Sequence, residues 1–222
     1  MKQIGLAIDL DGTIIDSKQA IQEALRYAFW QHNIANDGAI NGVKIGPPLI
    51  QIIKSVCPDA STSLIRKVSE SFMQVYDEKY CLDCSLYPDA KNAMRSLSRT
   101  YDLLLVTNKR IRPTETIVKH FGLDSFFSKV IGCDSLGDSY GEKSHVLVYL
   151  TENGNMAKGS CWYIGDTVGD ALACHKAGVP FVHAKWGYCE EKIASSLVSL
   201  AASDWREILS LPLSIPREAS NL

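Results

Sequence analysis

The chain has 222 residues, of which 46% are hydrophobic and 22% are charged, and its formal net charge is −2. This length and composition indicate a globular chain, with room for one domain or for a domain that carries a sizeable insertion, and they exclude a disordered one. The small net charge leaves no extended basic surface for nucleic acid and no polybasic segment for a membrane surface. Small ligands, anionic ones included, are left open as partners.

Neither a targeting segment nor a disulfide framework is expected. The N-terminus reaches acidic residues before a signal-peptide core could form, and no apolar run approaches the roughly 18 residues of a membrane-spanning helix. We therefore expect a cytoplasmic protein. The seven cysteines lie mostly in apolar segments and are expected to be thiols. Cys81 and Cys84 have CxxC spacing, but no second pair follows at zinc-finger distance, so we predict neither a zinc nor a redox site there.

The first predicted element is a short apolar strand at residues 3–9, which ends in two acids around one leucine. The sequence at this point is Asp9-Leu10-Asp11-Gly12-Thr13. Asp-Gly pairs are common in turns, so an ordinary strand end would need only one of the acids. The second acid calls for another explanation.

The next predicted elements are helices. Residues 16 to about 86 contain no convincing strand, and apolar positions recur at helical spacing in the segments 18–32, 49–56 and 63–80. A crossover between parallel strands needs only about a dozen residues, so this interval is too long for one. We predict a helical cap at residues 17–86, inserted in a core formed by residues 1–16 and 87–222. Asp16 is expected to begin its first helix, and Gly46-Pro47-Pro48 a loop before its second.

Strands and helices alternate over the rest of the chain. Continuous apolar runs at 102–107, 129–133, 160–165 and 179–183 are typical of strands that are buried on both faces of a parallel sheet. Helical patterns lie at 113–121, 143–153, 167–177 and 190–200. This order predicts a doubly wound, Rossmann-like α/β fold. The proline-punctuated segment 211–222 is expected to be a poorly anchored tail.

Polar residues follow several of these strands directly. In an open parallel sheet the carboxyl ends of the strands lie along one edge, where ligands bind. Each residue taken alone has an ordinary explanation, as part of a turn, a helix start or a solvated surface. Independent turns have no reason, however, to place acids, an amine and a hydroxyl on one edge. The candidate site residues are Asp9, Asp11, Thr107, Asn108, Lys143, Asp166 and Asp170.

These residue types suit phosphoryl transfer. Carboxylates gathered in one cleft repel one another unless a cation is present, and oxygen ligands suit Mg²⁺, which also contacts substrate phosphate. The Thr107 hydroxyl, the Lys143 amine and backbone N–H groups near Gly12 and Asn108 would stabilise a phosphoryl group during its transfer. With a carboxylate as the nucleophile, the intermediate would be an aspartyl phosphate.

The four sets of residues resemble the motifs of the haloacid dehalogenase-like superfamily of phosphotransferases. Its first motif, DxDG(T/V), is matched by residues 9–13, and its second, a Thr or Ser after the next strand, by Thr107 with Asn108. Its third, a lysine, is matched by Lys143, and its fourth, GDxxxD, by residues 165–170. The four motifs occur in the family's order, and the helical insertion corresponds to the C1 cap of that family.

Three further segments are similar to the phosphoglycolate phosphatase-like subfamily. They are residues 46–49, 106–109 and 185–188. One position departs from the family pattern, because many relatives have proline after the third-motif lysine, whereas Lys143 is followed by serine. The nearest competing lysine, Lys158, lies just before the fourth strand and so too far along the chain to begin the preceding helix.

The resemblance implies a division of roles among the acids. Asp9 would attack phosphorus and become phosphorylated, while Asp11 would protonate the leaving alkoxide and then take a proton from the attacking water. Mg²⁺ would be held by the Asp9 carboxylate, the Asp11 backbone carbonyl, Asp166 and waters. Asp170 would either support the metal ligands from behind or orient Lys143, and the first role is favoured.

The resemblance also implies a phosphate site and a substrate class. Thr107 would bind phosphate oxygens through its hydroxyl, and Asn108 mainly through its backbone. Gly12 would allow a sharp turn that aims N–H groups inward, and Thr13 would brace that turn. The substrate would be a small phosphorylated metabolite, with phosphoglycolate, sugar phosphates, nucleoside monophosphates and pyrophosphate all open. The implied phosphate-binding set is Leu10, Gly12, Thr107, Asn108 and Lys143.

Several alternatives share much of this pattern. A β-phosphoglucomutase-like phosphotransferase of the same superfamily would have nearly the same core residues and would differ in its cap. Cap residues such as Arg26, Lys44 and Tyr76 are candidates for substrate contact, yet each is equally well explained as packed or solvated. From a different class, a phospho-aspartate signalling module would use an acid after the third strand, here Asp134; the long insertion and Asp11 argue against it. The oligomeric state is not readable.

Overall fold

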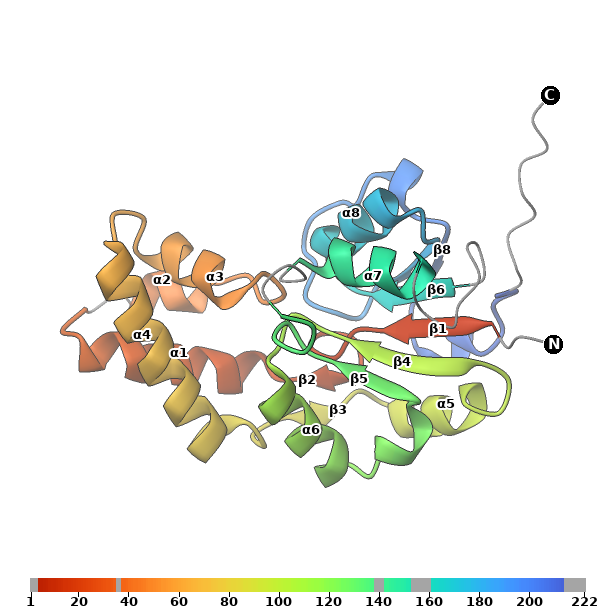
Figure 1. Cartoon of the computed structure of the whole chain (residues 1–222), viewed down its shortest axis with the longest axis horizontal. Coiled ribbons are helices and arrows are strands. Elements are labelled where there is room, and N and C mark those ends of the chain that lie inside the picture. The colour runs from red at the N-terminus through yellow and green to blue at the C-terminus, as the bar shows by residue number, and fades with distance from the viewer. Residues whose placement is uncertain (1–3, 35–36, 138–141, 153–160, 214–222) are drawn as a thin grey trace.

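Short apolar segments of the chain form a parallel sheet, as predicted, and the sheet has six strands (Figure 1). The computed structural model describes residues 4–34, 37–137, 142–152 and 161–213. The strand order is β5-β4-β1-β6-β7-β8, and every neighbouring pair is parallel. The strands are β1 (Gly5–Ile8), β4 (Asp102–Val106), β5 (Lys129–Ile131), β6 (Cys161–Gly165), β7 (Phe181–Ala184) and β8 (Leu200–Ala202).

Helices cover both faces of the sheet. Every residue of β1 and β6 is buried, which explains why these strands read as continuous apolar runs. Leu6 and Ile8 pack with helices α5, α6 and α9, while Ala7 between them packs with α7 and α8. The bounds of these helices are α5 (Ala90–Leu97), α6 (Ile111–His120), α7 (Lys143–Glu152), α8 (Val168–Ala177) and α9 (Trp205–Ile208), and a 3₁₀ turn, η2 (Asp124–Phe126), follows α6.

The helices between β2 and β3 pack together beside the sheet edge and share a hydrophobic cluster of their own (Figure 1). We call them the helical group. The chain leaves the core through β2 (Ile15–Asp16) and returns through β3 (Ser85–Leu86), which pair antiparallel. The group consists of α1 (Lys18–Gln31), α2 (Asp37–Asn41), α3 (Leu49–Val56), α4 (Thr62–Val75) and the π-helix η1 (Tyr76–Tyr80).

One predicted helix is wrong. Residues 190–200 contain a 3₁₀ turn, η4 (Ser195–Leu197), and the first residue of β8, which was not predicted. Ser195, Ser196 and Val198 have low helix propensity. The backbone groups of this region find partners in the sheet instead, since the Ser199 N–H donates to the Phe181 carbonyl at 3.0 Å.

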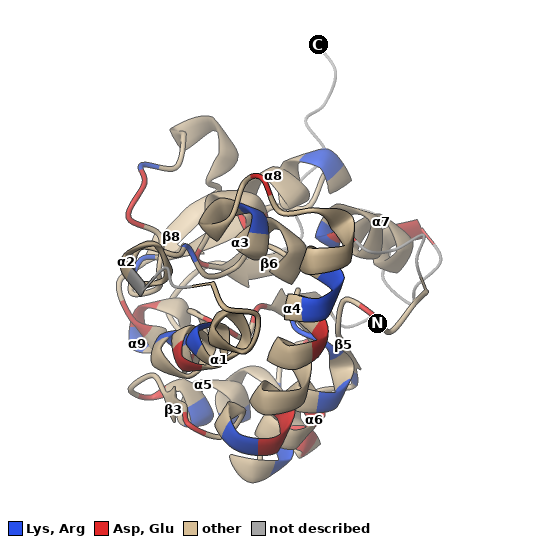
Figure 2. Ribbon diagram, turned by 90° about the vertical axis from the view of Figure 1, so that its left-hand side faces the viewer, with Lys and Arg blue, Asp and Glu red and all other residues tan. Residues whose placement is uncertain are grey.

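Other expectations about the chain have simple outcomes. All seven cysteines are free thiols. Within the described ranges, every helix is too short or too polar to cross a bilayer. Figure 2 shows basic and acidic residues interspersed along α1 and α6, in keeping with the small net charge. Residues 214–222 of the predicted tail, and Lys158, lie outside the described residues.

Candidate active site

The carboxyl ends of β1, β4 and β6 lie next to one another because β1 pairs with both of the other strands. Asp9 follows β1 directly, Thr107 follows β4, and Asp166 follows β6. Helix α7 begins with Lys143 at the same edge, and Asp170 lies in the first turn of α8. Residues that are distant in sequence therefore reach one place through the order of the strands.

Three buried carboxylates form the centre of this site. Asp9, Asp166 and Asp170 each offer an oxygen, and these oxygens lie within 4.8 Å of one another. The Nζ atom of Lys143 is 3.0 Å from Asp9 Oδ1 and 2.5 Å from Asp170 Oδ1, and this lysine is itself buried. Asp170 thus makes the contact with Lys143 that one of its two predicted roles requires.

Burial and charge give these groups unusual proton affinities. Burial, helped by the nearby charges of Asp170 and Asp11, raises the pKa of Asp9 to about 7 against the opposing effect of Lys143. Burial and the neighbouring acids Asp170 and Asp9 hold the pKa of Asp166 well above its usual range. Burial acts in the same direction on Asp170, but the Lys143 ammonium and Thr167 outweigh it and lower the pKa of Asp170. Two of the three carboxylates thus hold protons more readily than a solvated carboxyl group does.

Asp170 also takes part in the N-terminal cap of helix α8. The Thr167 side chain accepts a hydrogen bond from the Asp170 N–H at 3.1 Å, and Asp170 Oδ2 accepts one from the Thr167 N–H at 3.0 Å. This reciprocal pair is a capping box, which satisfies two backbone donors at the helix N-terminus. Asp170 is therefore held in place before any ligand binds.

The turn after β1 is tight and closely surrounded. Gly12 has a φ of +81°, which is in the left-handed region, and a Cβ atom there would lie 2.3 Å from Asp166 Oδ2. Its N–H, placed by the sequence among the phosphate donors, donates to the Ile15 carbonyl at 2.9 Å. What Gly12 supplies in this structure is the turn itself. The Thr13 hydroxyl donates to Asp166 Oδ1 at 3.4 Å.

A loop after β7 contributes contacts for which the sequence predicted no role. The Tyr188 N–H donates to Asp166 Oδ2 at 2.7 Å, and the Tyr188 hydroxyl accepts from the Ser17 N–H at 2.7 Å. A Cβ atom on Gly187 would lie 2.2 Å from Asp166 Cβ and 2.5 Å from the Gly12 carbonyl oxygen. The available signal was a glycine between two aromatic residues just after a strand, within the segment similar to the phosphoglycolate phosphatase-like subfamily.

Gly187→Ala is expected to destabilise the protein by about 1–3 kcal/mol, because the added methyl group overlaps a buried side chain and a backbone carbonyl. Urea denaturation measures the change. The control is Gly38→Ala, where a Cβ meets nothing within 4 Å and which lies in α2. That variant should be unchanged or more stable, by up to about 1 kcal/mol. Equal stability of the two variants would contradict the close approach at Gly187.

Asp11 lies apart from the three-carboxylate cluster. Its Oδ1 atom is 3.0 Å from Nζ of Lys109 and accepts a hydrogen bond from the Ser17 hydroxyl at 2.5 Å. Lys109 Nζ also donates to the hydroxyl of Tyr76, in η1, at 2.8 Å. Burial alone would lower the pKa of Lys109, but Asp11 and Tyr76 outweigh it and raise that pKa above its ordinary value. Sequence reasoning gave Lys109 no role, although it follows Thr107-Asn108 directly.

Thr107 and Asn108 lie at the carboxyl end of β4, as predicted, whereas Asp134 lies in the exposed segment after β5. Thr107 is buried, and its Oγ1 accepts the Lys109 N–H at 3.2 Å, which leaves the hydroxyl proton free to donate. The Asn108 side chain donates to the Gly46 carbonyl of the helical group at 2.8 Å. Asp134, the acid of the signalling alternative, is exposed after β5, where its Oδ1 accepts the Ile111 N–H at 2.7 Å.

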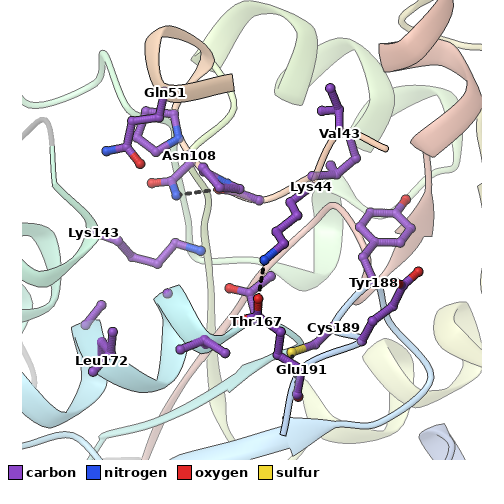
Figure 3. A pocket seen from close by; sticks show the side chains of 18 of the residues that line it. Val43, Lys44, Gln51, Asn108, Lys143, Thr167, Leu172, Tyr188, Cys189 and Glu191 are labelled. Carbon is purple, nitrogen blue, oxygen red and sulfur yellow. Dashed lines mark hydrogen bonds and ion pairs between the residues drawn. The ribbon is translucent and has the colours of Figure 1, made fainter. Parts of the chain in front are cut away.

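A cavity of about 570 Å³ lies between the helical group and the core. It is lined by the loop before α3 on one side and by the beginnings of α7 and α8 on the other. Lys143 and Lys44 point their amines into the same space, and Lys44 forms an ion pair with Glu191 across it (Figure 3). Lys143 and Thr167 line this cavity and also contact the acidic cluster, whereas the three carboxylates themselves are not among its lining residues. Its labelled lining includes Lys44, Gln51, Asn108, Lys143, Thr167 and Tyr188.

Comparison with known proteins gives matches over most of the chain. Residues 6–184 match the sequence profile described as haloacid dehalogenase-like hydrolase. A phosphoglycolate phosphatase of Vibrio parahaemolyticus is 30% identical over 219 residues, which cover 92% of this chain and 93% of that protein. One from Haemophilus influenzae strain 86-028NP is 27% identical over 195 residues, covering 82% of this chain and 86% of that protein.

Solved structures show the same fold. A haloacid dehalogenase-like family hydrolase from Streptococcus pneumoniae superposes with a TM-score of 0.82 at 24% identity, covering 94% of this chain and 98% of that one. A predicted phosphoglycolate phosphatase from Haemophilus somnus 129pt gives a TM-score of 0.80 at 25% identity, covering 95% and 98%. The matched segments include the helical group as well as the sheet.

Proposed function

This chain belongs to the haloacid dehalogenase-like hydrolase family, as its motifs predicted, and on that premise we propose that it hydrolyses a small phosphomonoester through an aspartyl phosphate on Asp9. The family match and the phosphoglycolate phosphatase relatives make it a phosphoric monoester hydrolase. One observation carries the mechanism, namely the buried contact of Asp9, in the acidic cluster, with Lys143, which also lines the cavity.

The residues of the cluster suit a divalent cation. If all three carboxylates are ionised, Lys143 is the one cation that contacts the cluster among the residues described in the structure, which leaves a net negative charge there. Burial, together with the neighbouring acids, raises the pKa of Asp9 and that of Asp166, so a nearby cation would favour their ionised forms. Oxygen-only ligands favour Mg²⁺, and we infer that Asp9, Asp166 and the Asp11 backbone carbonyl would hold it. Bound there, it would neutralise charge on the phosphoryl oxygens.

The protein's own groups would perform the chemistry in two displacements. In the first, the Asp9 carboxylate attacks phosphorus, the P–O bond to the substrate breaks, and the departing alkoxide takes a proton from Asp11. In the second, water attacks the same phosphorus, its proton passes to Asp11, and the acyl phosphate bond breaks to release phosphate and Asp9. Thr107 and Lys143 would donate to the phosphoryl oxygens in both steps.

The helical group would act as the cap of this site. It supplies one wall of the cavity and contacts the core through Asn108 and Gly46. A closed wall would exclude water until the phosphoenzyme forms and would set which substrates fit. Phosphoglycolate is the first substrate to test, because the named relatives are phosphoglycolate phosphatases.

Removing the metal is expected to abolish hydrolysis of p-nitrophenyl phosphate, and MgCl₂ in excess of EDTA should restore it. Below pH 7 the effect of Mg²⁺ should weaken, because protons compete for Asp9, whose pKa is about 7, and for Asp166. The folded protein without metal binds these protons more readily than the unfolded chain does. The stability that Asp9 contributes is therefore lost as the pH rises through about 7, Asp166 acts in the same direction, and Mg²⁺ offsets that loss.

The measurement for this prediction is the melting temperature with and without MgCl₂ between about pH 5 and pH 8, alongside the activity assay. The shift produced by Mg²⁺ should grow as the pH rises. Undiminished turnover in EDTA would overturn the proposed function. A shift that is the same at all pH values would show that Asp9 and Asp166 do not hold the ion.

A further inference from the structure

Lys109 lies where the core meets the helical group, and its amine contacts Asp11 of the core and Tyr76 of the helical group. Its amine is 3.0 Å from Asp11 Oδ1 and 2.8 Å from the Tyr76 hydroxyl, and it lies 4.6 Å from the centre of the Tyr76 ring. The side chains of Lys109 and Asp11 are only 7% and 10% exposed. A buried ammonium that is held on two sides has little freedom to move, so it fixes what it contacts.

The contacts on Asp11 leave one of its oxygens free. Lys109 and the Ser17 hydroxyl both contact Oδ1. Within the described ranges no hydrogen bond is made by Oδ2. A carboxyl group that is held by one oxygen presents the other in a defined direction, which is what proton transfer to a departing group requires.

We propose that Lys109 is a positioning residue for Asp11, and that Tyr76 of the helical group completes its position. The proposal rests on the proposed function, since it takes the proton-transfer role of Asp11 as given. It adds a link between the two parts of the protein, because the group that fixes the acid of the core is itself fixed by a side chain of the cap.

The adjacent residue provides a matched comparison. Arg110 Nη2 lies 2.5 Å from Asp77 Oδ1, so it joins the same loop after β4 to the same π-helix η1. Arg110 makes no contact with Asp11 among the described residues. Loss of the Arg110 contact would loosen the helical group generally, whereas loss of Lys109 or of the Tyr76 hydroxyl would also release Asp11.

The test compares two aryl phosphates of similar shape, phenyl phosphate and p-nitrophenyl phosphate. Phenolate is the more basic leaving group and depends more on a donated proton, while nitrophenolate departs almost without one. The value of kcat/KM reports steps up to release of the phenol, so slow hydrolysis of the phosphoenzyme does not mask the effect. The ratio of kcat/KM for phenyl phosphate to kcat/KM for p-nitrophenyl phosphate therefore measures the proton transfer contributed by Asp11. A purely structural defect would lower both values together and leave the ratio unchanged.

We expect Lys109→Met to lower this ratio by about tenfold, part of the roughly 10²–10⁴-fold that a general acid contributes. Tyr76→Phe, which keeps the ring and removes the hydroxyl, should change the ratio in the same direction by less. Arg110→Met should leave the ratio unchanged. Asp11→Asn should show the largest fall in the ratio that loss of this proton transfer can cause. Adding Lys109→Met to Asp11→Asn should lower the ratio no further, since both substitutions act on one group.

Either of two results would overturn the proposal. One is an unchanged ratio in Lys109→Met, and the other is an equal fall in Arg110→Met, which would assign the effect to docking of the helical group. If Lys109→Met does not fold by circular dichroism, Tyr76→Phe decides in its place. Failure of the proposed function is separate, because it would appear in the wild-type protein as turnover that does not need Mg²⁺.

Discussion

Asp9→Asn is expected to lower kcat by about 10⁴-fold or more and to abolish the phosphoenzyme, because an amide cannot act as the attacking oxygen. The substitution keeps the shape of the side chain. Lys143 keeps its partner Asp170 at 2.5 Å, so the fold should survive the loss of one carboxylate. The measurements are kcat with p-nitrophenyl phosphate and acid-quenched trapping of radiolabelled phosphoenzyme, with the melting temperature as the check on folding.

The matched control is Asp134→Asn, which makes the same change in the exposed acid after β5. Turnover and label should both be normal in this variant. If the label disappears from Asp134→Asn and persists in Asp9→Asn, the protein is phosphorylated in the manner of the signalling alternative. The mechanism proposed above would then be wrong.

Lys143→Met is expected to lower the free energy of unfolding by about 3–5 kcal/mol at neutral pH and to remove activity. Methionine has a similar length but no charge, so Asp9 and Asp170 are left buried without the amine that lies 3.0 Å from one and 2.5 Å from the other. The loss should shrink as the pH falls, because protonation of these carboxyl groups removes the unpaired charge. Urea denaturation across the pH range measures it.

A surface ion pair serves as the control for this variant. Arg66 lies 3.9 Å from Glu70 one helical turn away, and both side chains are more than half exposed. Arg66→Met should cost less than about 1 kcal/mol. A Lys143→Met protein as stable as the Arg66→Met protein would show that the buried amine does not hold the acidic cluster together.

The sheet was readable from the sequence because burial on both faces leaves few choices of residue. Because β1 and β6 are buried throughout, their sequences are continuous apolar runs that predict strands. β8 was missed because it is short, its first two residues are only partly buried, and it follows a segment whose apolar positions also suit a helix. The true pairing is with β7, which local sequence does not reveal.

The candidate site was readable for a related reason. Parallel strands bring their carboxyl ends to one edge, so the parallel sheet predicted from the sequence places Asp9, Thr107 and Asp166 together. Lys109 and Tyr188 were not assigned roles, because their importance lies in contacts with residues far away in the sequence. Tyr76 is 33 residues from Lys109, and Asp166 is 22 residues from Tyr188. No periodicity encodes such pairs.

Asp170 has a wider consequence for how this chain can change over time. The same carboxylate starts helix α8 through its capping box with Thr167 and holds the amine of Lys143. A substitution at position 170 would impair both the folding of the protein and the chemistry of the site. Natural selection on activity therefore also preserves the start of this helix, and a library of random variants should find position 170 far less tolerant than a typical helix N-terminus.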